Sequence, residues 1–226
     1  MSIISIHQPN FLPWPGYFSK IIKSDIFVFL DDVKCSKNSF FNRNRFSSND
    51  SWFWLGIPVS KSSYSIKINE VTVDNKFIDK HLKYFKLSHK KKTQEKEIID
   101  ALICFYERKY QEKVINLSQF NIELIILILS FLDCNTKIVK SSDLEINSGY
   151  KKQDLLIEII KSLEGKEYIS GFGAKAYQEE SRFLENDISI CYNKFSPNDN
   201  HMIDNECMSI VDCFLRSDLQ QIISEF

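Results

Sequence analysis

The sequence predicts an α/β fold in which a parallel or mixed sheet is covered by helices on both faces. The chain opens with a short apolar segment at residues 2–6, a helical pattern at 16–23 and an unbroken apolar run at 26–30. Such a run is typical of a strand buried on both faces, as in a parallel sheet. Strand and helix patterns alternate again between residues 136 and 192, which is the alternation typical of α/β folds.

The 226 residues are expected to form a single domain, 1–226, with a mainly helical subregion at about 77–133. Within the middle of the chain, the patterns predict an ordered loop or short hairpin at 35–51, strands at 52–59 and 65–73, and helices near 77–89, 95–112 and 117–133. In the last third they predict a strand at 136–139, a helix at 154–163 closed by Gly165, a strand at 168–169, a helix at 174–184, a strand at 188–192 and one or two helices within 209–223.

Charge and hydropathy exclude several classes of protein. The 29 basic and 30 acidic residues give a net charge of −1, so no nucleic-acid partner is expected. The N-terminus lacks the basic residues of a signal peptide. The longest apolar segment, 124–132, is far shorter than the roughly 20 residues that span a bilayer, so no membrane span is expected. A cytoplasmic location follows as the expectation.

The loop after the first predicted strand carries the main candidate for catalysis. His7 and Gln8 are its first polar residues, and three prolines restrict the backbone that follows them. Asp31 and Asp32 follow the second predicted strand. If the two strands are parallel, His7 and the aspartates share the carboxyl edge of the sheet, where ligands bind in such folds.

We expect His7 to act as a base that Asp31 or Asp32 orients. Only one aspartate is expected to face His7, because successive side chains of a strand point to opposite sides. The alternatives are a structural histidine and an Asp32 that begins a turn.

Further polar residues are candidates for substrate binding. In the N-terminal loop these are Gln8, Asn10 and Tyr17, and in the segment 35–51 they are Asn38, Asn42 and Arg43. A guanidinium group binds phosphate or carboxylate with two hydrogen bonds, and carboxamides bind sugar hydroxyls. Asparagines are also common in turns, so a purely structural role for this segment is equally open.

A glycine-containing segment near residue 170 is a candidate anion site. Ser170 and Gly171 lie between a predicted strand and a predicted helix, with Lys175 and Tyr177 close behind. Small residues there allow backbone N–H groups to approach an anion at the start of a helix. The spacing is not that of a P-loop, and a simple tight turn is the alternative.

Metal and cysteine chemistry have weak signals. His81 and His89 are eight residues apart, His201 stands alone, and no HExxH or Cys/His cluster occurs. No structural metal is expected, the cofactor is unknown, and a carboxylate-held Mg²⁺ near Asp31 stays open as an alternative. Cys35 follows the second strand between Lys34 and Lys37, which would favour its thiolate, so it is the alternative nucleophile.

Two N-terminal motifs connect the chain to a known family. "IHQPNFLPWPGYFSKI" and "SDIFVFLDDVKCSKNSFFNRNR" resemble the signature of the WbqC-like family, and "KHLKYF", "YISGFGAKAYQ" and "SIVDCFL" are weaker matches in the expected order. The resemblance implies a role in bacterial O-antigen or surface-polysaccharide biosynthesis. Family members carry an aromatic residue at the position of Cys35, which argues against a required nucleophile there. Their Pro-x-Tyr-x-Gln pattern is absent, since Pro197 is followed by Asp199 and His201.

The first strand, histidine loop, helix and second strand also resemble the N-terminal βαβ unit of the nucleotidylyltransferase-like fold. Those enzymes carry a second histidine where this chain has Tyr17. Adenylate chemistry is therefore not implied, because a fold does not establish a function.

The preferred hypothesis is an enzyme that transfers an acyl or aminoacyl group to the amine of a nucleotide-linked amino sugar. His7 would accept the proton of the attacking amine, Gln8 and Asn38 would bind substrate or the developing oxyanion, and Arg43 and Lys175 would hold phosphate. An acyl carrier protein as donor and a homodimer are open. The alternatives are a non-catalytic sugar- or carrier-binding subunit for a partner transferase, and a glycosyltransferase.

Overall fold

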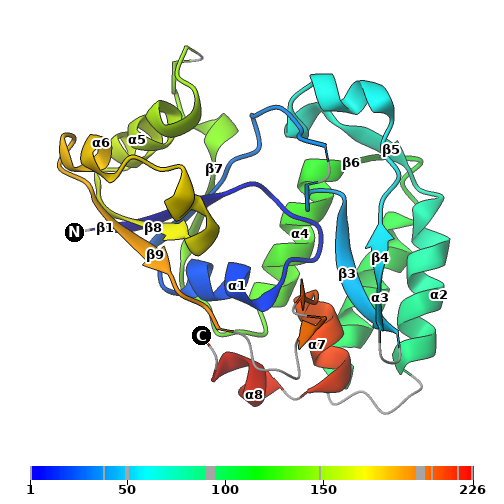
Figure 1. Ribbon diagram of the computed structural model, residues 1–226. Helices are drawn as coiled ribbons and strands as arrows, with labels where there is room; N and C mark the ends of the chain where they lie inside the picture. The colour runs from blue at the N-terminus through cyan, green and yellow to red at the C-terminus, as the bar shows by residue number, and fades with distance from the viewer. Residues whose placement is uncertain are drawn as a thin grey trace. The chain divides into compact units, whose positions relative to one another are not determined.

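The computed structural model describes residues 2–37, 39–48, 51–89, 95–147, 149–196, 202–204, 206–217, 219–224 and 226 (Figure 1). Its contacts divide the chain into two compact units. Unit 1 comprises residues 1–8, 16–32 and 135–196, and unit 2 comprises residues 9–15, 33–134 and 197–226. Each unit is described by itself.

Unit 1 is built on a five-stranded parallel sheet. Its strands are β1 (Ser2–His7), β2 (Ile26–Phe29), β7 (Lys137–Lys140), β8 (Gly165–Gly171) and β9 (Ser189–Asn193). Their order is β7-β2-β1-β8-β9, and every neighbouring pair is parallel. The predicted α/β class is confirmed, and the sheet is parallel throughout.

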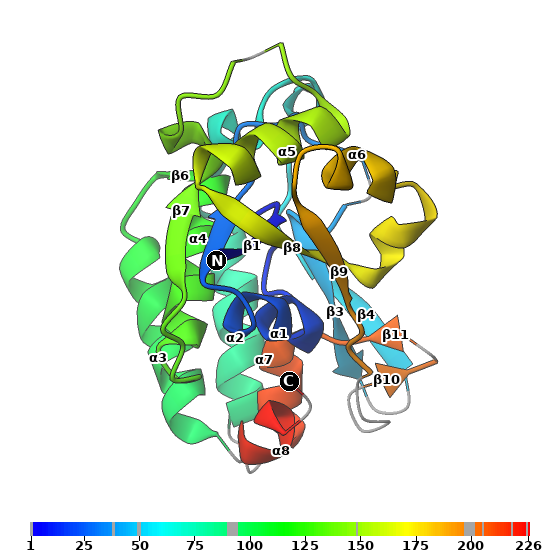
Figure 2. The ribbon, with the colours of Figure 1, turned by 90° about the vertical axis from the view of Figure 1, so that its left-hand side faces the viewer.

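Helices cover both faces of this sheet, as the sequence predicts. The helix α1 (Pro15–Ile22) lies on one face, whereas α5 (Lys152–Ser162) and α6 (Glu180–Leu184) lie on the other (Figures 1 and 2). Side chains of β1 alternate between the two faces. Ile4 and Ile6 join a buried cluster that includes Ile160 of α5. Ser5 points the opposite way, and its hydroxyl lies 2.8 Å from that of Ser24.

The strand order creates a switch point at the centre of the sheet. The chain begins at β1, adds β2 and β7 on one side, and then returns to add β8 and β9 on the other. In such sheets, ligands bind outside the carboxyl ends of the strands where the order reverses. Here that point lies between β1 and β8. Their pairing ends at Ser5 and Ile169, beyond which the two strands part.

The end of α5 differs from the prediction that Gly165 closes the helix. The helix ends at Ser162, and Glu164 takes the left-handed conformation, with φ of 55°. Gly165 is instead the first residue of β8, where a Cβ atom would lie 2.4 Å from Cγ1 of Ile4. Close packing of β8 against β1 therefore requires this glycine.

The predicted helix at 174–184 is divided in two. A 3₁₀ helix, η4, spans Phe172–Ala176, and α6 begins only at Glu180. The side chain of Gln153 explains the break. Its Nε2 donates to the carbonyl of Glu179 at 2.6 Å, and its Oε1 accepts from the N–H of Glu179 at 3.1 Å. The N–H of Glu179 is thereby withdrawn from a continuous helix, while its carbonyl also accepts from the Arg182 N–H at 3.2 Å as α6 begins.

Unit 2 contains a hairpin and short 3₁₀ segments before its helices. The strands β3 (Arg43–Ser48) and β4 (Ser51–Gly56) pair antiparallel. The first lies within the expected hairpin segment 35–51, and the second is the strand predicted at 52–59, so the two predictions together form one hairpin. The predicted strand at 65–73 is wrong. The chain forms η1 (Lys61–Ser65) and η2 (Ile68–Glu70), and only β5 (Thr72–Asp74) pairs, with β6 (Val114–Asn116). Glu70 accepts from the N–H of Lys67, which favours the local turn.

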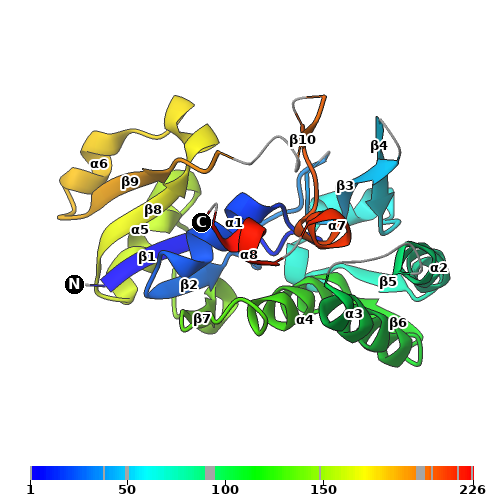
Figure 3. The same ribbon diagram turned by 90° about the horizontal axis from the view of Figure 1, so that it is seen from below.

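Three helices follow, close to the ranges 77–89, 95–112 and 117–133 that the periodicity predicts. These are α2 (Phe77–His89), α3 (Lys96–Lys109) and α4 (Leu117–Leu129), and α3 packs against both of the others (Figure 3). Asn116 caps α4 by accepting from the N–H of Gln119 at 2.9 Å. The C-terminal part forms β10 (Met202–Ile203), β11 (Glu206–Cys207), α7 (Ile210–Arg216) and α8 (Leu219–Ile223), which confirms the terminal helices.

Candidate functional site

The carboxyl edge of the unit 1 sheet gathers several of the predicted site residues. His7 ends β1 and is paired with Phe29, the last residue of β2. Asp31 and Asp32 follow β2, and Ser170 and Gly171 end β8. Because all five strands are parallel, these residues lie at the same edge of the sheet. The expected common edge for His7 and the two aspartates is therefore present.

His7 is held in a defined tautomer. Its Nδ1 lies 3.2 Å from the carbonyl oxygen of Gln8, which accepts hydrogen bonds only, so Nδ1 carries the proton. Nε2 then carries the lone pair, and no described residue is hydrogen-bonded to it. The imidazole meets the Tyr17 ring edge to face, with centroids 4.8 Å apart. The Tyr17 hydroxyl also donates to the Gln8 carbonyl, at 2.9 Å. One carbonyl thus positions both rings.

The environment of His7 keeps its imidazole neutral. Burial and, to a smaller extent, the positive charge of Lys20 lower the pKa of His7 to about 3. The hydrogen bond to Gln8 opposes this shift only in part. At neutral pH, His7 therefore offers an unprotonated Nε2 that can accept a proton.

Lys20 is a site residue that the sequence reasoning missed. Its side chain is buried, its Nζ donates to the Ile6 carbonyl at 3.0 Å, and the Nζ lies 5.9 Å from the centroid of Phe27. Ile6 follows the last residue of β1 that pairs with β8, so the amine lies where β1 and β8 part. Burial lowers the pKa of Lys20 to about 7. No carboxylate in the described chain pairs with it. The sequence feature that could have revealed Lys20 is its place on the apolar stripe of α1, three residues after Tyr17.

Asp31 and Asp32 are bound to the turn that follows β7, not to His7. Asp31 accepts from the Ser142 N–H at 3.0 Å and from the Ser142 hydroxyl at 2.8 Å. The Ser141 hydroxyl donates to Oδ1 of Asp32 at 2.5 Å and lies 3.2 Å from Oδ1 of Asp31. The expectation that the two aspartates point to opposite sides is wrong, because both lie beyond the end of β2. Gln8, not an aspartate, orients the imidazole.

The segment after β8 is open to approach. The Ser170 hydroxyl donates to Oε1 of Gln178 at 2.8 Å. Gly171 has an ordinary φ of −69°, and a Cβ atom on Gly171 or Gly173 would meet nothing within 4 Å. Lys175 lies inside η4, with its Nζ 5.7 Å from the centroid of Tyr192. The expected helix N-terminus directly after Gly171 is therefore replaced by a short 3₁₀ turn.

A cavity of about 730 Å³ lies beside this segment. We call it the α5 pocket, and it is lined by Leu30, Lys151, Lys152, Gln153, Asp154, Leu156, Tyr177, Gln178, Glu179 and Arg182. Tyr177, one of the predicted substrate contacts, is 77% exposed there. Gln178 connects the pocket to Ser170 at the end of β8. The cations Lys151, Lys152 and Arg182 are residues that the sequence reasoning did not single out.

The remaining predicted contacts lie in unit 2, apart from Asn38, which is outside the described residues. Asn10 is buried, and the amide of Asn42 donates to the Ile57 carbonyl at 2.9 Å. The Arg43 guanidinium lies 4.3 Å from the centroid of Trp54. Asn42 thus supports the hairpin, and Arg43 is held flat on an aromatic ring. A joint clamp of these residues with His7 stays a prediction.

The loop after Gln8 is anchored within unit 2 by buried asparagines. Asn121 donates to the carbonyls of Pro9 and Phe41, at 2.9 and 2.7 Å. Asn44 donates to the Leu12 carbonyl at 2.7 Å. These bonds satisfy backbone groups of a proline-rich segment that forms no regular structure. The loop is consequently a fixed element.

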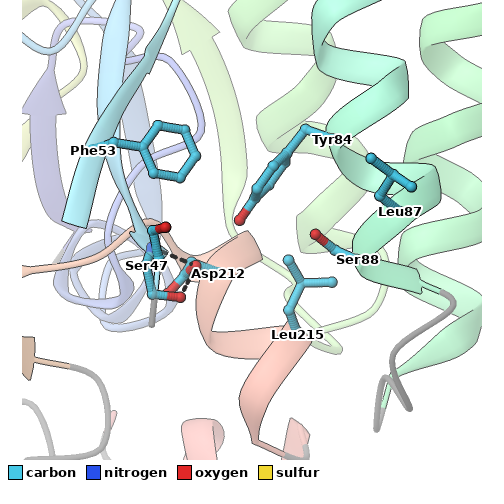
Figure 4. A pocket seen from close by; sticks show the side chains of 8 residues that line it. Ser47, Phe53, Tyr84, Leu87, Ser88, Asp212 and Leu215 are labelled. Atoms are coloured by element: carbon cyan, nitrogen blue, oxygen red, sulfur yellow. Dashed lines mark hydrogen bonds between the residues drawn. The ribbon is translucent and has the colours of Figure 1, made fainter. Parts of the chain in front are cut away.

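Unit 2 also contains a smaller cavity of about 420 Å³ between the hairpin, α2 and α7 (Figure 4). Asp212 accepts from the N–H and the hydroxyl of Ser47, at 2.9 and 2.7 Å, and pairs with Arg216 at 2.8 Å. Burial, followed by the charge of Asp212, raises the pKa of Tyr84. Because Ser47 and Arg216 already satisfy the carboxylate, we assign this cavity no ligand.

His81 has a structural role. Its Nε2 donates to the Gly56 carbonyl at 3.1 Å, so Nδ1 is the acceptor for the Tyr106 hydroxyl at 3.3 Å. Burial lowers the pKa of His81 to about 4. Neither nitrogen is available to a metal. Among the described residues, no group of three His, Cys, Asp or Glu side chains is arranged to hold a metal ion.

Cys35 lacks the features of an activated nucleophile. It is buried, and burial raises the pKa of its thiol. Lys34 and Lys37 do not overcome this effect, so the thiol stays protonated at neutral pH. In the described part of the chain, no helix is both long and apolar enough to cross a membrane.

Comparison with known proteins places the chain in a family. The sequence pattern of the WbqC-like protein family matches residues 8–223. The chain belongs to the WbqC-like protein family. The match begins at Gln8, directly after His7. A WbqC-like fold in this chain is thus the five-stranded sheet of unit 1 together with the hairpin and helices of unit 2.

One curated relative is "Uncharacterized protein Rv1507c" of Mycobacterium tuberculosis. It is 30% identical over 194 residues, which cover 85% of this chain and 82% of the relative. No solved structure matches this WbqC-like protein.

Proposed function

We propose that this WbqC-like protein is an enzyme that transfers an acyl or aminoacyl group to the amine of a nucleotide-linked amino sugar. The pathway would be the biosynthesis of a bacterial surface polysaccharide such as O-antigen. The carrying observation is His7, a neutral imidazole with a fixed tautomer at the switch point of a parallel sheet. The edge that surrounds it is the part of the fold where ligands bind.

The reaction requires a base next to the nucleophile. The amine nitrogen attacks the activated carbonyl carbon, the C–N bond forms, and the leaving group departs with the electron pair of its broken bond. The proton that the nitrogen loses passes to Nε2 of His7. The negative charges of a phosphorylated substrate would raise the low pKa of His7 in the complex and strengthen it as a base.

Other residues support this reaction in distinct ways. The carbonyl of Gln8 fixes the imidazole, and the Gln8 side chain would donate to the developing oxyanion. Tyr17 is buried and acts through the same carbonyl, so it is a positioning residue. Asp31 stabilises the edge by joining the end of β2 to the turn after β7.

Substitution of His7 by Asn tests the proposal. Transfer to a nucleotide-linked amino sugar is expected to fall by at least about a hundredfold, because a positioned base contributes that much or more. The melting temperature serves as the control for folding. Tyr17→Phe should give a smaller loss, since it removes one of the two bonds to the Gln8 carbonyl. An unchanged rate in His7→Asn would remove His7 from the mechanism.

A second candidate is a non-catalytic subunit that binds a carrier protein. The hairpin favours it, because the Arg43 guanidinium stacks on Trp54 and is only partly buried, whereas Arg45 is already paired with Glu206 at 2.8 Å. Such a face suits an acidic partner. For this candidate, Arg43→Ala should abolish capture of an acyl carrier protein, while His7→Asn leaves capture intact.

A glycosyltransferase is the weakest candidate, because both oxygens of Asp31 and one oxygen of Asp32 accept hydrogen bonds from Ser141 and Ser142, which leaves a single carboxylate oxygen without such a bond to hold a divalent ion. Transfer activity is therefore expected to be unaffected by EDTA. A strict requirement for a divalent ion would instead favour glycosyl transfer.

A further inference from the structure

The α5 pocket lies at the carboxyl edge of the unit 1 sheet. Leu30, directly after β2, forms one side, and the start of α5 and residues 177–182 form the others. The walls are fixed from within. Gln153 binds both backbone groups of Glu179, and Arg182 pairs with Asp154. The volume of about 730 Å³ lies within the roughly 300–1,000 Å³ that is usual for small-molecule sites.

The lining carries an excess of positive charge. Lys151, Lys152 and Arg182 face only two carboxylates, and Asp154 is occupied by Arg182. Within the described chain, neither lysine has an ion pair or a side-chain hydrogen bond. The 11-residue helix α5 begins here without a side-chain cap, so its first N–H groups add to the positive potential. The pocket therefore favours an anion with several oxygens.

The pocket also has an apolar and aromatic side. Tyr177 is 77% exposed although it is a large aromatic residue, and Leu30 and Leu156 line the same cavity. A planar ring that stacked on Tyr177 would cover this surface. Gly171, six residues before Tyr177, has open space beside it, because no described atom lies within 4 Å of where its Cβ atom would be. A ligand that is anionic at one end and planar at the other satisfies both parts of the lining.

We propose that the α5 pocket binds the nucleoside diphosphate part of the substrate, with its phosphate oxygens at Lys151 and Lys152 and its base against Tyr177. The assignment rests on the proposed function, which supplies a nucleotide-linked substrate. It replaces Arg43 and Lys175 as the expected phosphate contacts. His7 at the end of β1 then serves the sugar end of the same molecule.

Calorimetric titration with uridine 5′-diphosphate, and separately with inorganic pyrophosphate, tests this assignment in the full chain. The double variant Lys151→Ala, Lys152→Ala should bind both probes at least about tenfold more weakly than the wild type. Lys161→Ala is the matched control, because Lys161 lies in the last turn of the same helix and pairs with Glu158. It should bind as the wild type does. Circular dichroism and melting curves verify that the variants fold.

Tyr177→Leu separates the two parts of the pocket. This substitution should lower the affinity for uridine 5′-diphosphate several-fold and leave the affinity for pyrophosphate unchanged, since only the nucleoside reaches the ring. An equal affinity of wild type and Tyr177→Leu for uridine 5′-diphosphate would overturn the assignment of the base to Tyr177.

The inference fails if the wild type binds neither probe, or if the double lysine variant binds both as tightly as Lys161→Ala. Its failure is distinct from failure of the proposed function. Binding that depends on Lys151 and Lys152, without acylation of any amino sugar, would keep the nucleotide site and reject the transferase. Acylation whose rate does not change when both lysines are replaced would keep the transferase and reject the nucleotide site.

Discussion

At the scale of single residues, the buried amine of Lys20 is the least expected feature of the sheet edge. An ammonium group taken out of water without a carboxylate partner destabilises a fold, and such groups are concentrated at functional sites. Lys20 also acts on His7, since its charge helps to keep the imidazole neutral. The two groups therefore belong to one electrostatic unit at the end of β1.

Replacement of Lys20 by Met is expected to stabilise the protein. The folded pKa of about 7, against 10.5 for a free lysine, corresponds to about 4 kcal/mol of unfavourable free energy at pH 7. The Ile6 carbonyl loses its donor, which costs about 2 kcal/mol. A net gain of about 2 kcal/mol in the free energy of unfolding should appear in urea titrations. A destabilised variant would mean that the lysine is not buried as a charge.

His81 predicts how stability depends on pH. Its folded pKa of about 4 lies below its ordinary value of 6.5, so the unfolded chain binds the extra proton between these values. The contribution of His81 to the free energy of unfolding is therefore fully present above pH 6.5. It falls by about 3 kcal/mol as the pH drops towards 4. His7 acts in the same direction, down to about pH 3. Urea titrations at several pH values give the free energy of unfolding as a function of pH. Between pH 4 and 6.5 this free energy should change less steeply with pH for His81→Gln than for wild type. Equal slopes would contradict the account.

At the scale of elements, Gly165, Gly171 and Gly173 in and after β8 differ in whether the fold leaves room for a side chain. Gly165→Ala would place a Cβ atom 2.4 Å from Ile4 and 2.8 Å from Ile160, so a loss of about 1–3 kcal/mol is expected. Gly171→Ala and Gly173→Ala meet open space and should leave stability unchanged or raise it by about 0.5 kcal/mol. Thermal unfolding of the three variants checks this order. A destabilised Gly171→Ala would show that the fold, not ligand access, requires that glycine.

The elements that could be predicted from the sequence are those whose burial leaves a repeating apolar pattern. The apolar run at 26–30 and the helical periodicity of α1 predict the first βαβ unit, because burial on both faces leaves a pattern in the sequence. The helix predicted at 174–184 fails because Gln153, which precedes it in the chain, binds Glu179. The strand predicted at 65–73 fails because Glu70 closes a local turn. Contacts of single side chains leave no periodic signal.

At the scale of the whole molecule, the sheet order determines which candidate residues can act together. The edge that holds His7, Asp31 and Ser170 was predictable, because parallel strands bring their carboxyl ends to one side. The role of Asp31 was not, since it depends on Ser142, which lies in the turn after β7 and is distant in the sequence. The α5 pocket was hidden for the same reason, because its cations come from the start of α5 and from α6.

The measurement that tests the central claim most directly is product mass after incubation of the WbqC-like protein with a nucleotide-linked amino sugar and an activated acyl donor. The predicted result is a mass increase equal to the acyl group on the amino sugar. No increase is expected on the matching sugar that carries a hydroxyl in place of the amine, nor with the His7→Asn variant. Equal acylation of both sugars, or full activity of His7→Asn, would contradict transfer to an amine with His7 as the base.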